Sequence, residues 1–216
     1  MSLESLLPMV LAAIALVLVV TAYWMRHQRR NRAWRQFAAL HDWSCIYSLG
    51  TWEVAGLHRG RQFRMRTERH QSNGPGQPHT YLCTVVRLEF GQALPPDVRI
   101  RPEGIADKLL KVIGQRDEDV GDAKLDALLN LEYLSDETRD ILRAPGVRQQ
   151  LMTLCRRFTD FTIEGARLTA MKRGMPDSVE ALESLVAPAL LLSDALHEVA
   201  GEAHGRGAGQ PSSVAT

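Results

Sequence analysis

The segment "WSCIYSLGTWEVAGLHRGRQFRMRTERH", residues 43–70, shows most clearly how this chain folds. It is rich in aromatic and β-branched residues and is punctuated by glycine, which is typical of short antiparallel strands. Gly60 separates two strand-like arms and predicts a hairpin turn. In the second arm Phe63, Met65 and Thr67 alternate with charged residues. This alternation predicts a sheet with one face toward a core and the other toward water.

Further strands are indicated on the C-terminal side of this segment. The stretch "TYLCTVVRLEF", residues 80–90, predicts a longer strand, and a mobile loop, "QSNGPGQPH", precedes it. The stretch "LPPDVRIRPEG", residues 94–104, predicts a short edge strand, because proline is tolerated at a sheet edge. A second hairpin is predicted over residues 160–174, with its turn at Glu164–Gly165.

Helical signals follow the first strands. The stretch "IADKLLKVIG", residues 105–114, predicts a short helix that ends at a glycine. Ser135 is expected to cap the helix "DETRDILRA", and Pro145 is expected to begin the next one. In that second helix the apolar residues recur at helical spacing, which predicts burial of Val147, Leu151, Leu154 and Phe158.

The last predicted helix is "SVEALESLVAPALLLSDALHEVA", residues 178–200. Asp177 and Glu180 form a capping-box pair at its start, and Pro188 is expected to kink or divide it. From Gly201 onward the chain is small and polar, which predicts a disordered tail over 201–216. Because the strands cluster first and do not alternate regularly with helices, residues 42–200 are predicted to form one soluble α+β domain. Its mainly antiparallel sheet is packed with several helices.

The N-terminus carries an apolar run, "LLPMVLAAIALVLVVTAYWM", residues 6–25. A helix of this length spans a hydrocarbon core of about 30 Å. A cleaved signal peptide has a basic start and a small-residue exit, whereas this run starts after Glu4 and ends at Tyr23 and Trp24. The sequence therefore predicts an N-terminal transmembrane anchor over 1–25, continued by a basic juxtamembrane helix over 26–41.

The charges that flank the apolar run predict its orientation. Basic residues are concentrated on the C-terminal side, which predicts that the N-terminus is outside and the domain is cytoplasmic. Tyr23 and Trp24 are expected at the headgroup level of a bacterial inner membrane. The membrane-interface candidates are Tyr23, Trp24, Arg26, Arg29, Arg30, Arg32 and Arg35. Two roles remain open for these arginines, fixing topology alone or binding anionic lipid or a partner.

Composition excludes some functions and leaves others open. With 26 basic and 25 acidic residues, the net charge gives no reason to expect nucleic acid as a partner. Cys45, Cys83 and Cys155 are odd in number and far apart, which fits buried thiols in a reducing compartment rather than disulfides or a zinc site. No motif for a dinucleotide, a nucleotide phosphate or a serine nucleophile is present, so no cofactor is expected.

The acidic stretch "GQRDEDVGDAKLDALL", residues 114–129, is the first candidate for chemistry. An EF-hand counted from Asp117 fails, because the sixth position is Asp122 instead of glycine and the twelfth is Leu128 instead of glutamate. Asp122 and Asp126 remain as candidates for a divalent metal or for acid–base catalysis, since they share a helix face. The alternative is a solvated turn followed by a helix that Asp122 caps.

A run of arginines along the first hairpin is the second candidate. Arg64 and Arg66 share a strand face on which they can meet phosphate. A solvated sheet face explains the same residues without a ligand. Aromatic residues do not interleave with them, which disfavours single-stranded nucleic acid as the ligand. The whole run consists of Arg59, Arg61, Arg64, Arg66 and Arg69.

The order of these motifs resembles a group of uncharacterised single-pass bacterial membrane proteins. The motifs that carry the resemblance are "GLHRGRQFRMR", "LPPDVRIRPEG", "GDAKLDALLNL" and "TIEGARLTAMKRG". In that group a GD-x-x-[FL]-D-x-x-[FL] core lies within a cytoplasmic domain of unknown function. The resemblance implies no catalytic residues, and it implies that Leu125, Leu128 and Leu129 serve the core.

Together these observations predict a membrane-tethered cytoplasmic interaction or scaffold domain. Its partners are the bilayer, through residues 5–25, and a protein of unknown identity. Two alternatives stay open: an enzyme that uses Asp122 and Asp126 on a phosphate-bearing substrate, and a domain that binds anionic lipid. Whether the protein is an enzyme is left undecided, with the absence of catalytic motifs favouring a non-enzyme.

Overall fold

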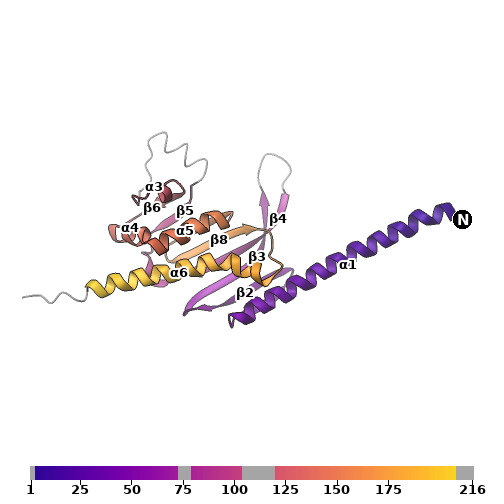
Figure 1. The fold of residues 1–216 in the computed structure, drawn as a ribbon, viewed down its shortest axis with the longest axis horizontal. Coiled ribbons are helices and arrows are strands. Elements are labelled where there is room, and N and C mark those ends of the chain that lie inside the picture. The colour runs from indigo at the N-terminus through magenta and orange to yellow at the C-terminus, as the bar shows by residue number, and fades with distance from the viewer. Residues whose placement is uncertain (1–2, 73–78, 104–119, 208–216) are drawn as a thin grey trace, which may run out of the picture.

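The computed structural model describes residues 3–72, 79–103 and 120–207 (Figure 1). The elements are α1 (Leu3–Leu40), β1 (Ser44–Ser48), β2 (Thr51–His58), β3 (Arg61–Ser72), β4 (His79–Glu89), η1 (Gly91–Ala93), β5 (Arg99–Pro102), α3 (Ala123–Asp126), β6 (Leu129–Glu132), α4 (Asp136–Arg143), α5 (Pro145–Arg157), β7 (Asp160–Glu164), β8 (Arg167–Arg173) and α6 (Val179–Gly207).

The strands form one antiparallel sheet in the order β1-β2-β3-β4-β8-β7-β5-β6. All the ladders are antiparallel, including β4 against β8, which joins the first hairpins to the last one. The predicted α+β class with an antiparallel sheet is confirmed. The hairpin turn at Gly60 is confirmed as well, since β2 and β3 pair from His58 and Arg61 outward.

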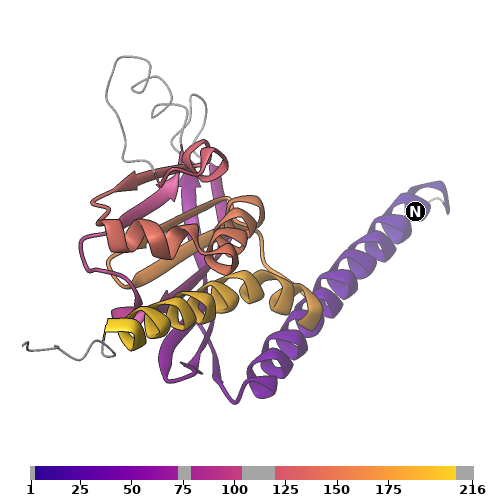
Figure 2. The same ribbon diagram turned by 60° about the vertical axis from the view of Figure 1, so that its left-hand side comes forward.

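The helices α4, α5 and α6 lie across one face of the sheet (Figure 2). That face supplies the core through alternate residues of each strand, as the period-two pattern predicted. Val54, Met65, Val86 and Ile163 are completely buried beneath the helices. The intervening residues form the opposite face, which carries charged side chains.

The first helix, α1, joins this core with its C-terminal part only. Ala33, Trp34, Phe37 and Ala38 are buried and lie on one side of the helix, as spacings of three and four residues require. Figure 1 shows the N-terminal part of α1 extending away from the domain. The basic segment after the apolar run therefore continues the same helix into the domain, as predicted.

The last helix differs from the prediction at three points. Its cap is Ser178, whose Oγ accepts the backbone N–H of Ala181 at 3.1 Å, so the expected Asp177 cap is wrong. The helix is continuous through Pro188 and is not divided there. It also continues to Gly207, so the predicted tail from 201 begins too early, and residues 208–216 lie outside the described part.

Burial explains why α6 tolerates Pro188. Leu185, Val186, Ala189 and Leu192 flank the proline and are buried, so tertiary contacts stabilise the helix by more than the lost backbone hydrogen bond costs.

The expectation that residues 94–104 form an edge strand is also wrong. β5 pairs with β6 through Ile100↔Leu131 and with β7 through Ile100↔Ile163, so it lies inside the sheet. Its prolines lie before the strand or at its last position, Pro102, where the ladder is ending. The ends of the predicted loop 71–79 are wrong, since Ser72 and His79 are paired strand residues, and residues 73–78 lie outside the described part. The predicted helix 105–114 lies outside the described residues.

The remaining helix predictions are confirmed. Ser135 caps α4 through a hydrogen bond from the N–H of Thr138 at 3.1 Å, and Pro145 is the first residue of α5. Val147, Leu151, Leu154 and Phe158 are buried. Leu125 and Leu129 belong to the core, but Leu128 is 40% exposed and does not.

Candidate functional site

The N-terminal half of α1 presents many large apolar side chains to the outside. Every residue from Met9 to Met25 is exposed. By length and composition the described helix Met9–Leu40 is able to cross a membrane. Tyr23 and Trp24, at the end of the apolar run, are 74% and 60% exposed. The structure thus separates α1 into an exposed apolar half and a half that is anchored in the core.

The five arginines after Met25 are not equivalent. Arg26, Arg29, Arg32 and Arg35 are exposed, whereas Arg30 is half-buried on the side that faces the domain. A helix advances about 1.5 Å per residue, so Arg26 to Arg30 lie within about 8 Å of Met25 and Arg35 lies about 15 Å away. Only the nearer arginines therefore lie beside the end of the apolar run.

The acidic segment holds its two candidate carboxylates in structural hydrogen bonds. Asp122 caps α3 by accepting the N–H groups of Lys124 and Leu125 at 2.9 and 3.3 Å. It also pairs with Arg148 of α5, and this hydrogen bond from Arg148 is the main reason that the pKa of Asp122 is below its ordinary value. Asp117, Glu118 and Asp119 lie outside the described residues.

Asp126 is engaged separately from Asp122. Its two carboxylate oxygens accept the N–H groups of Val120 and Gly121 at 2.9 and 3.2 Å. Both aspartates therefore accept hydrogen bonds from backbone N–H groups of the same short segment, residues 120–125. Across the residues that the structure describes, no group of three or more His, Cys, Asp or Glu side chains is arranged to hold a metal ion.

The run of arginines on the first hairpin is divided between the two faces of the sheet. Arg64 and Arg66 share the uncovered face. Arg64 lies 3.4 Å from Glu53, and Arg66 pairs with Glu68. Arg59 and Arg61 instead reach α6, where both contact Asp194. The stripe is therefore not one cationic surface.

Glu68 is the centre of the charge network on the uncovered face. It accepts hydrogen bonds from Arg66 and, at 3.0 Å, from Arg87 of β4. Burial by itself raises the pKa of Glu68, but the two guanidinium groups outweigh burial and hold that pKa below its ordinary value. The charges of Arg64, Arg66 and Arg87 are thus matched by carboxylates on the same face.

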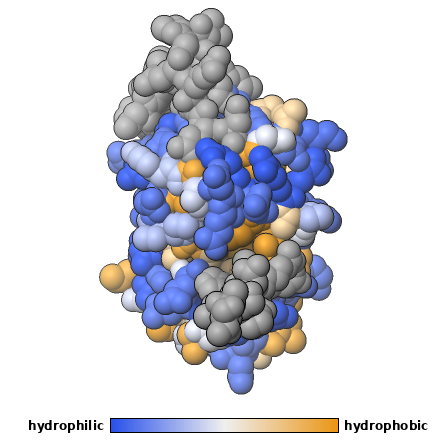
Figure 3. All heavy atoms as spheres, turned by 90° about the vertical axis from the view of Figure 1, so that its left-hand side faces the viewer, coloured by the Kyte–Doolittle hydropathy of each residue, from blue (hydrophilic) through white to orange (hydrophobic). Residues whose placement is uncertain are grey.

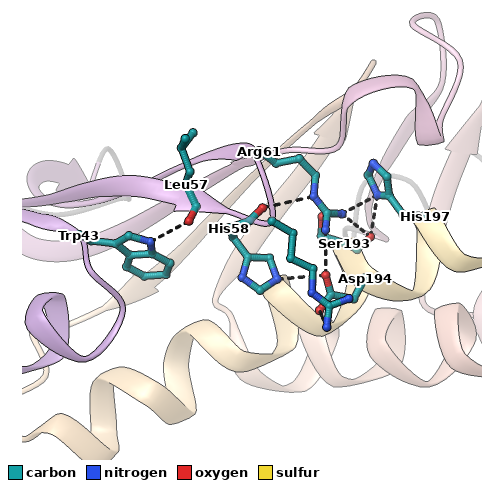
Figure 4. Close-up of polar contacts among 8 residues, drawn as sticks. Trp43, Leu57, His58, Arg61, Ser193, Asp194 and His197 are labelled. Carbon is teal, nitrogen blue, oxygen red and sulfur yellow. Dashed lines mark hydrogen bonds and ion pairs between the residues drawn. The ribbon is translucent and has the colours of Figure 1, made fainter.

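A polar cluster joins the β2–β3 turn to the middle of α6 (Figure 4). Arg61 donates to Asp194 Oδ1 at 2.9 Å, and to the carbonyl oxygen and Oγ of Ser193 at 2.9 and 2.7 Å. His58 Nε2 lies 3.0 Å from the same carboxylate oxygen of Asp194. His197 Nδ1 lies 2.5 Å from Arg61 Nη1.

This cluster contains Ser, His and Asp, but its hydrogen bonds act as a structural clamp, because they join β3 to α6. The Ser193 side chain is fully buried and its Oγ receives a hydrogen bond from Arg61 rather than giving its proton to a histidine. A nucleophilic serine needs a base within hydrogen-bond reach and access to substrate. The cluster instead fixes the β2–β3 turn against α6.

Sequence reasoning missed this cluster, although one signal was available. Arg61 has the same strand parity as Phe63 and Met65, so it lies on the covered face of β3. A charged residue on that face requires a buried partner. Asp194, however, is 133 residues away along the chain and nothing in the local sequence identifies it.

A cationic hollow of about 430 Å³ lies between the end of β8 and the start of α6. Arg157, Lys172 and Arg173 line it together with Met175 and Leu185. Arg173 stacks over the Tyr81 ring at 4.2 Å, and Arg157 contacts the hydroxyl of Ser184. Two of the three cations are therefore already held by neighbouring side chains.

An apolar groove lies at the end of the domain that is remote from the N-terminus of α1. Figure 3 faces this end and shows apolar residues between hydrophilic ones. The groove separates η1 from α4 and the end of α6. Its lining includes Leu94, Pro95, Pro96, Ile141, Ala166 and Ala200, with Glu137 at the same site.

Comparisons with known proteins identify no family. No family model matches the chain, and no curated protein matches it. One similar solved structure is the "crystal structure of the mycobacterial trehalose monomycolate transport factor A, TtfA", at 13% identity. The similarity covers 78% of this chain and 94% of that chain, with a TM-score of 0.44.

Proposed function

We propose that this protein is a single-pass membrane protein whose α+β domain acts as an interaction or scaffold domain on the cytoplasmic face. The observation that carries the proposal is the division of α1. Residues 9–25 are apolar and exposed, whereas Trp34 and Phe37 of the same helix are completely buried in the domain. One continuous helix thus belongs to two environments.

A bilayer is the environment that suits the exposed half. Isolated apolar side chains are common on protein surfaces, but an uninterrupted apolar helix surface marks a contact with membrane or protein. Residues 5–25 form about 31 Å of helix, which matches the thickness of a hydrocarbon core. Tyr23 and Trp24 then fall at the interface, where amphipathic rings are favoured.

The charges that follow the apolar run support the cytoplasmic placement of the domain. Arg26, Arg29 and Arg30 come within five residues of Met25, whereas the other end of the apolar run is preceded by Glu4. Basic residues close to a transmembrane segment are retained on the cytoplasmic side. For a bacterial protein this side is the inner face of the inner membrane.

The way in which α1 joins the domain supports a scaffold role. No glycine or proline interrupts the chain between Met9 and Leu40, and Trp34 Nε1 donates to the carbonyl oxygen of Pro176 at 3.1 Å. A domain on a flexible linker samples many orientations. A domain fixed to its helix presents one surface at a constant distance from the bilayer, which favours assembly with a partner.

The carboxylate enzyme is not the function that the geometry supports best. The oxygens of Asp122 and Asp126 already accept hydrogen bonds from the chain. A catalytic carboxylate needs an oxygen within reach of its substrate. The apolar groove at the remote end of the domain is better suited to a protein partner, because apolar anchors in a hollow dominate interface energies.

In-cell photo-crosslinking tests the proposed interaction. A photoreactive residue at Glu137, on the groove, should give a reproducible crosslinked protein from the full chain in its membrane. The matched control is Gln149, an exposed residue of α5 outside the groove. A product at Glu137 and none at Gln149 supports the proposal. Repeated absence of any product from Glu137, and from Arg64 on the uncovered sheet face, would contradict it.

A further inference from the structure

The β1–β2 turn presents a bulky apolar residue in an unfavourable backbone conformation. Leu49 and Gly50 connect the strands with φ values of 50° and 78°. Two-residue turns with positive φ at both positions favour asparagine or aspartate before glycine, and a leucine in this region is uncommon. The Leu49 side chain is 100% exposed. Neither turn geometry nor core contacts explain a leucine here.

The hairpin that carries Leu49 runs back along α1 toward its apolar half. Near the end of α1 the Phe37 ring lies 5.8 Å from that of Trp43. Further along, the His27 ring meets the Tyr47 ring edge to face, also with centroids 5.8 Å apart. As the chain proceeds from Trp43 to Tyr47 in β1, its ring neighbour on α1 therefore changes from Phe37 to His27. The turn lies beyond this point, on the side of residues 9–25.

The rise of each element places Leu49 at the level of the aromatic residues of α1. Tyr23 lies about 6 Å beyond His27 along the helix. Leu49 lies up to about 7 Å beyond Tyr47 along the strand. If residues 5–25 cross a bilayer, Leu49 is therefore level with Tyr23 and Trp24, where the hydrocarbon core meets the headgroups.

One cationic side chain lies at this apolar tip, and two more lie next to the His27 contact on α1. Arg69 Nη2 lies 3.8 Å from the position that a Cβ would occupy at Gly50. Arg26 and Arg30 flank His27 on α1. An apolar residue next to arginines is the combination that binds the interface of a membrane with anionic lipids, because burial and phosphate attraction act together.

We propose that the tip of the β1–β2 hairpin is a second membrane-contact site. Leu49 enters the bilayer interface beside α1, and Arg69 faces the lipid phosphates. This proposal rests on the proposed anchoring by α1. With two contacts the domain cannot rotate about the α1 axis, so the apolar groove at its remote end is held away from the bilayer.

An environment-sensitive fluorophore tests the contact in the full chain. Leu49→Cys is labelled with a nitrobenzoxadiazole probe, and the protein is reconstituted in vesicles of phosphatidylethanolamine and phosphatidylglycerol. Burial raises the pKa of Cys45, Cys83 and Cys155, so these native thiols label slowly. The residual labelling is measured in the unsubstituted chain and subtracted.

The matched control is the β2–β3 turn, which has the same geometry at the other end of β2. Arg59 and Gly60 have φ values of 48° and 81°, and Arg59 is exposed at 69% of its side chain. Eight strand residues separate the two turns, a distance of about 26 Å. The same probe at Arg59→Cys is expected to show the emission of a probe that is exposed to water.

The expected result is blue-shifted emission from the probe at position 49 and quenching by lipids that carry a spin label near the headgroup. Position 59 should show neither effect. If the protein floats with the vesicles but the probe at position 49 shows neither a blue shift nor quenching, as at position 59, the second contact does not exist. The proposed anchoring by α1 would still stand. If the protein does not float with the vesicles at all, the anchor itself fails, and the second contact fails with it.

Discussion

Trp43 lies directly over Gly56, so that a Cβ at position 56 would be 2.0 Å from Trp43 Cδ1. The indole stacks on Phe63 at a centroid distance of 4.2 Å, and its Nε1 donates to the carbonyl oxygen of Leu57 at 3.0 Å. Trp43 follows α1 directly, so this contact holds the end of the helix against β2 and β3. It helps to fix the orientation of α1 relative to the sheet, together with the contact of Trp34 with Pro176.

Gly56→Ala is therefore expected to destabilise the junction between α1 and the sheet. The added methyl group collides with a ring that is fixed on both sides, and overpacking of this kind costs about 1–3 kcal/mol or more. Thermal unfolding of the full chain in detergent measures the effect. Gly146→Ala is the control, because the nearest atom to its Cβ would be at 3.6 Å. Equal melting temperatures for the two variants would contradict the tight contact.

Arg61→Ala is expected to lower the free energy of unfolding by about 3–5 kcal/mol, because it leaves the Asp194 carboxylate without its main partner. The side chain of Arg61 is only 11% exposed, and that of Asp194 is 20% exposed. Denaturant titration of the full chain is the measurement. Arg59→Ala removes a 69% exposed guanidinium 3.4 Å from the same carboxylate and should cost about 0–1 kcal/mol. If both variants cost the same, the cluster is not a clamp.

The lowered pKa of Glu68 predicts a loss of stability in acid. Its pKa in the folded chain lies below the ordinary value of 4.5, so its contribution is fully present above that pH. The contribution is lost as pH falls through the folded pKa. Glu68→Gln should flatten this part of a stability-against-pH curve. Arg87→Met, which removes one partner, should move the loss toward higher pH. An unchanged curve in both variants would contradict the network.

Asp122→Ala should lower the melting temperature by more than Asp122→Asn, because an asparagine side chain still caps α3. Magnesium or calcium should leave the melting temperature of the unsubstituted chain unchanged. A shift with either ion that Asp122→Ala abolishes would instead support the metal-dependent enzyme. The titration thus separates the capping role from the catalytic one.

Local patterns were enough to predict much of the fold. The alternation around Phe63 and Met65 predicted the first hairpin, and Ser135 and Pro145 predicted the starts of two helices. These signals depend on the backbone and on near neighbours. β5 was misplaced because prolines signal an edge locally, whereas its partners β6 and β7 come from distant parts of the chain. Pro188 was expected to kink or divide α6, because the burial of the residues around it cannot be seen from the local sequence.

The candidate site was harder to predict for the same reason. Asp122 was expected either to cap a helix or to bind a metal. Its ion pair with Arg148 of α5 could not be predicted, because the two residues are far apart in the sequence. The arginines of β3 looked like one stripe, but strand parity and Asp194 divide them between two faces. The contact between His27 and Tyr47, which places the β1–β2 turn beside the apolar run, is a tertiary relationship.

The proposed topology of α1 can be measured with a reporter fused after Thr216. A fluorescent protein that folds only in the cytoplasm should be active there, and alkaline phosphatase, which needs export, should be inactive. Both fusions should remain in the membrane fraction after a high-salt wash. Active phosphatase with a dark fluorescent protein, or release of either fusion as a soluble protein, would contradict a cytoplasmic domain tethered by α1.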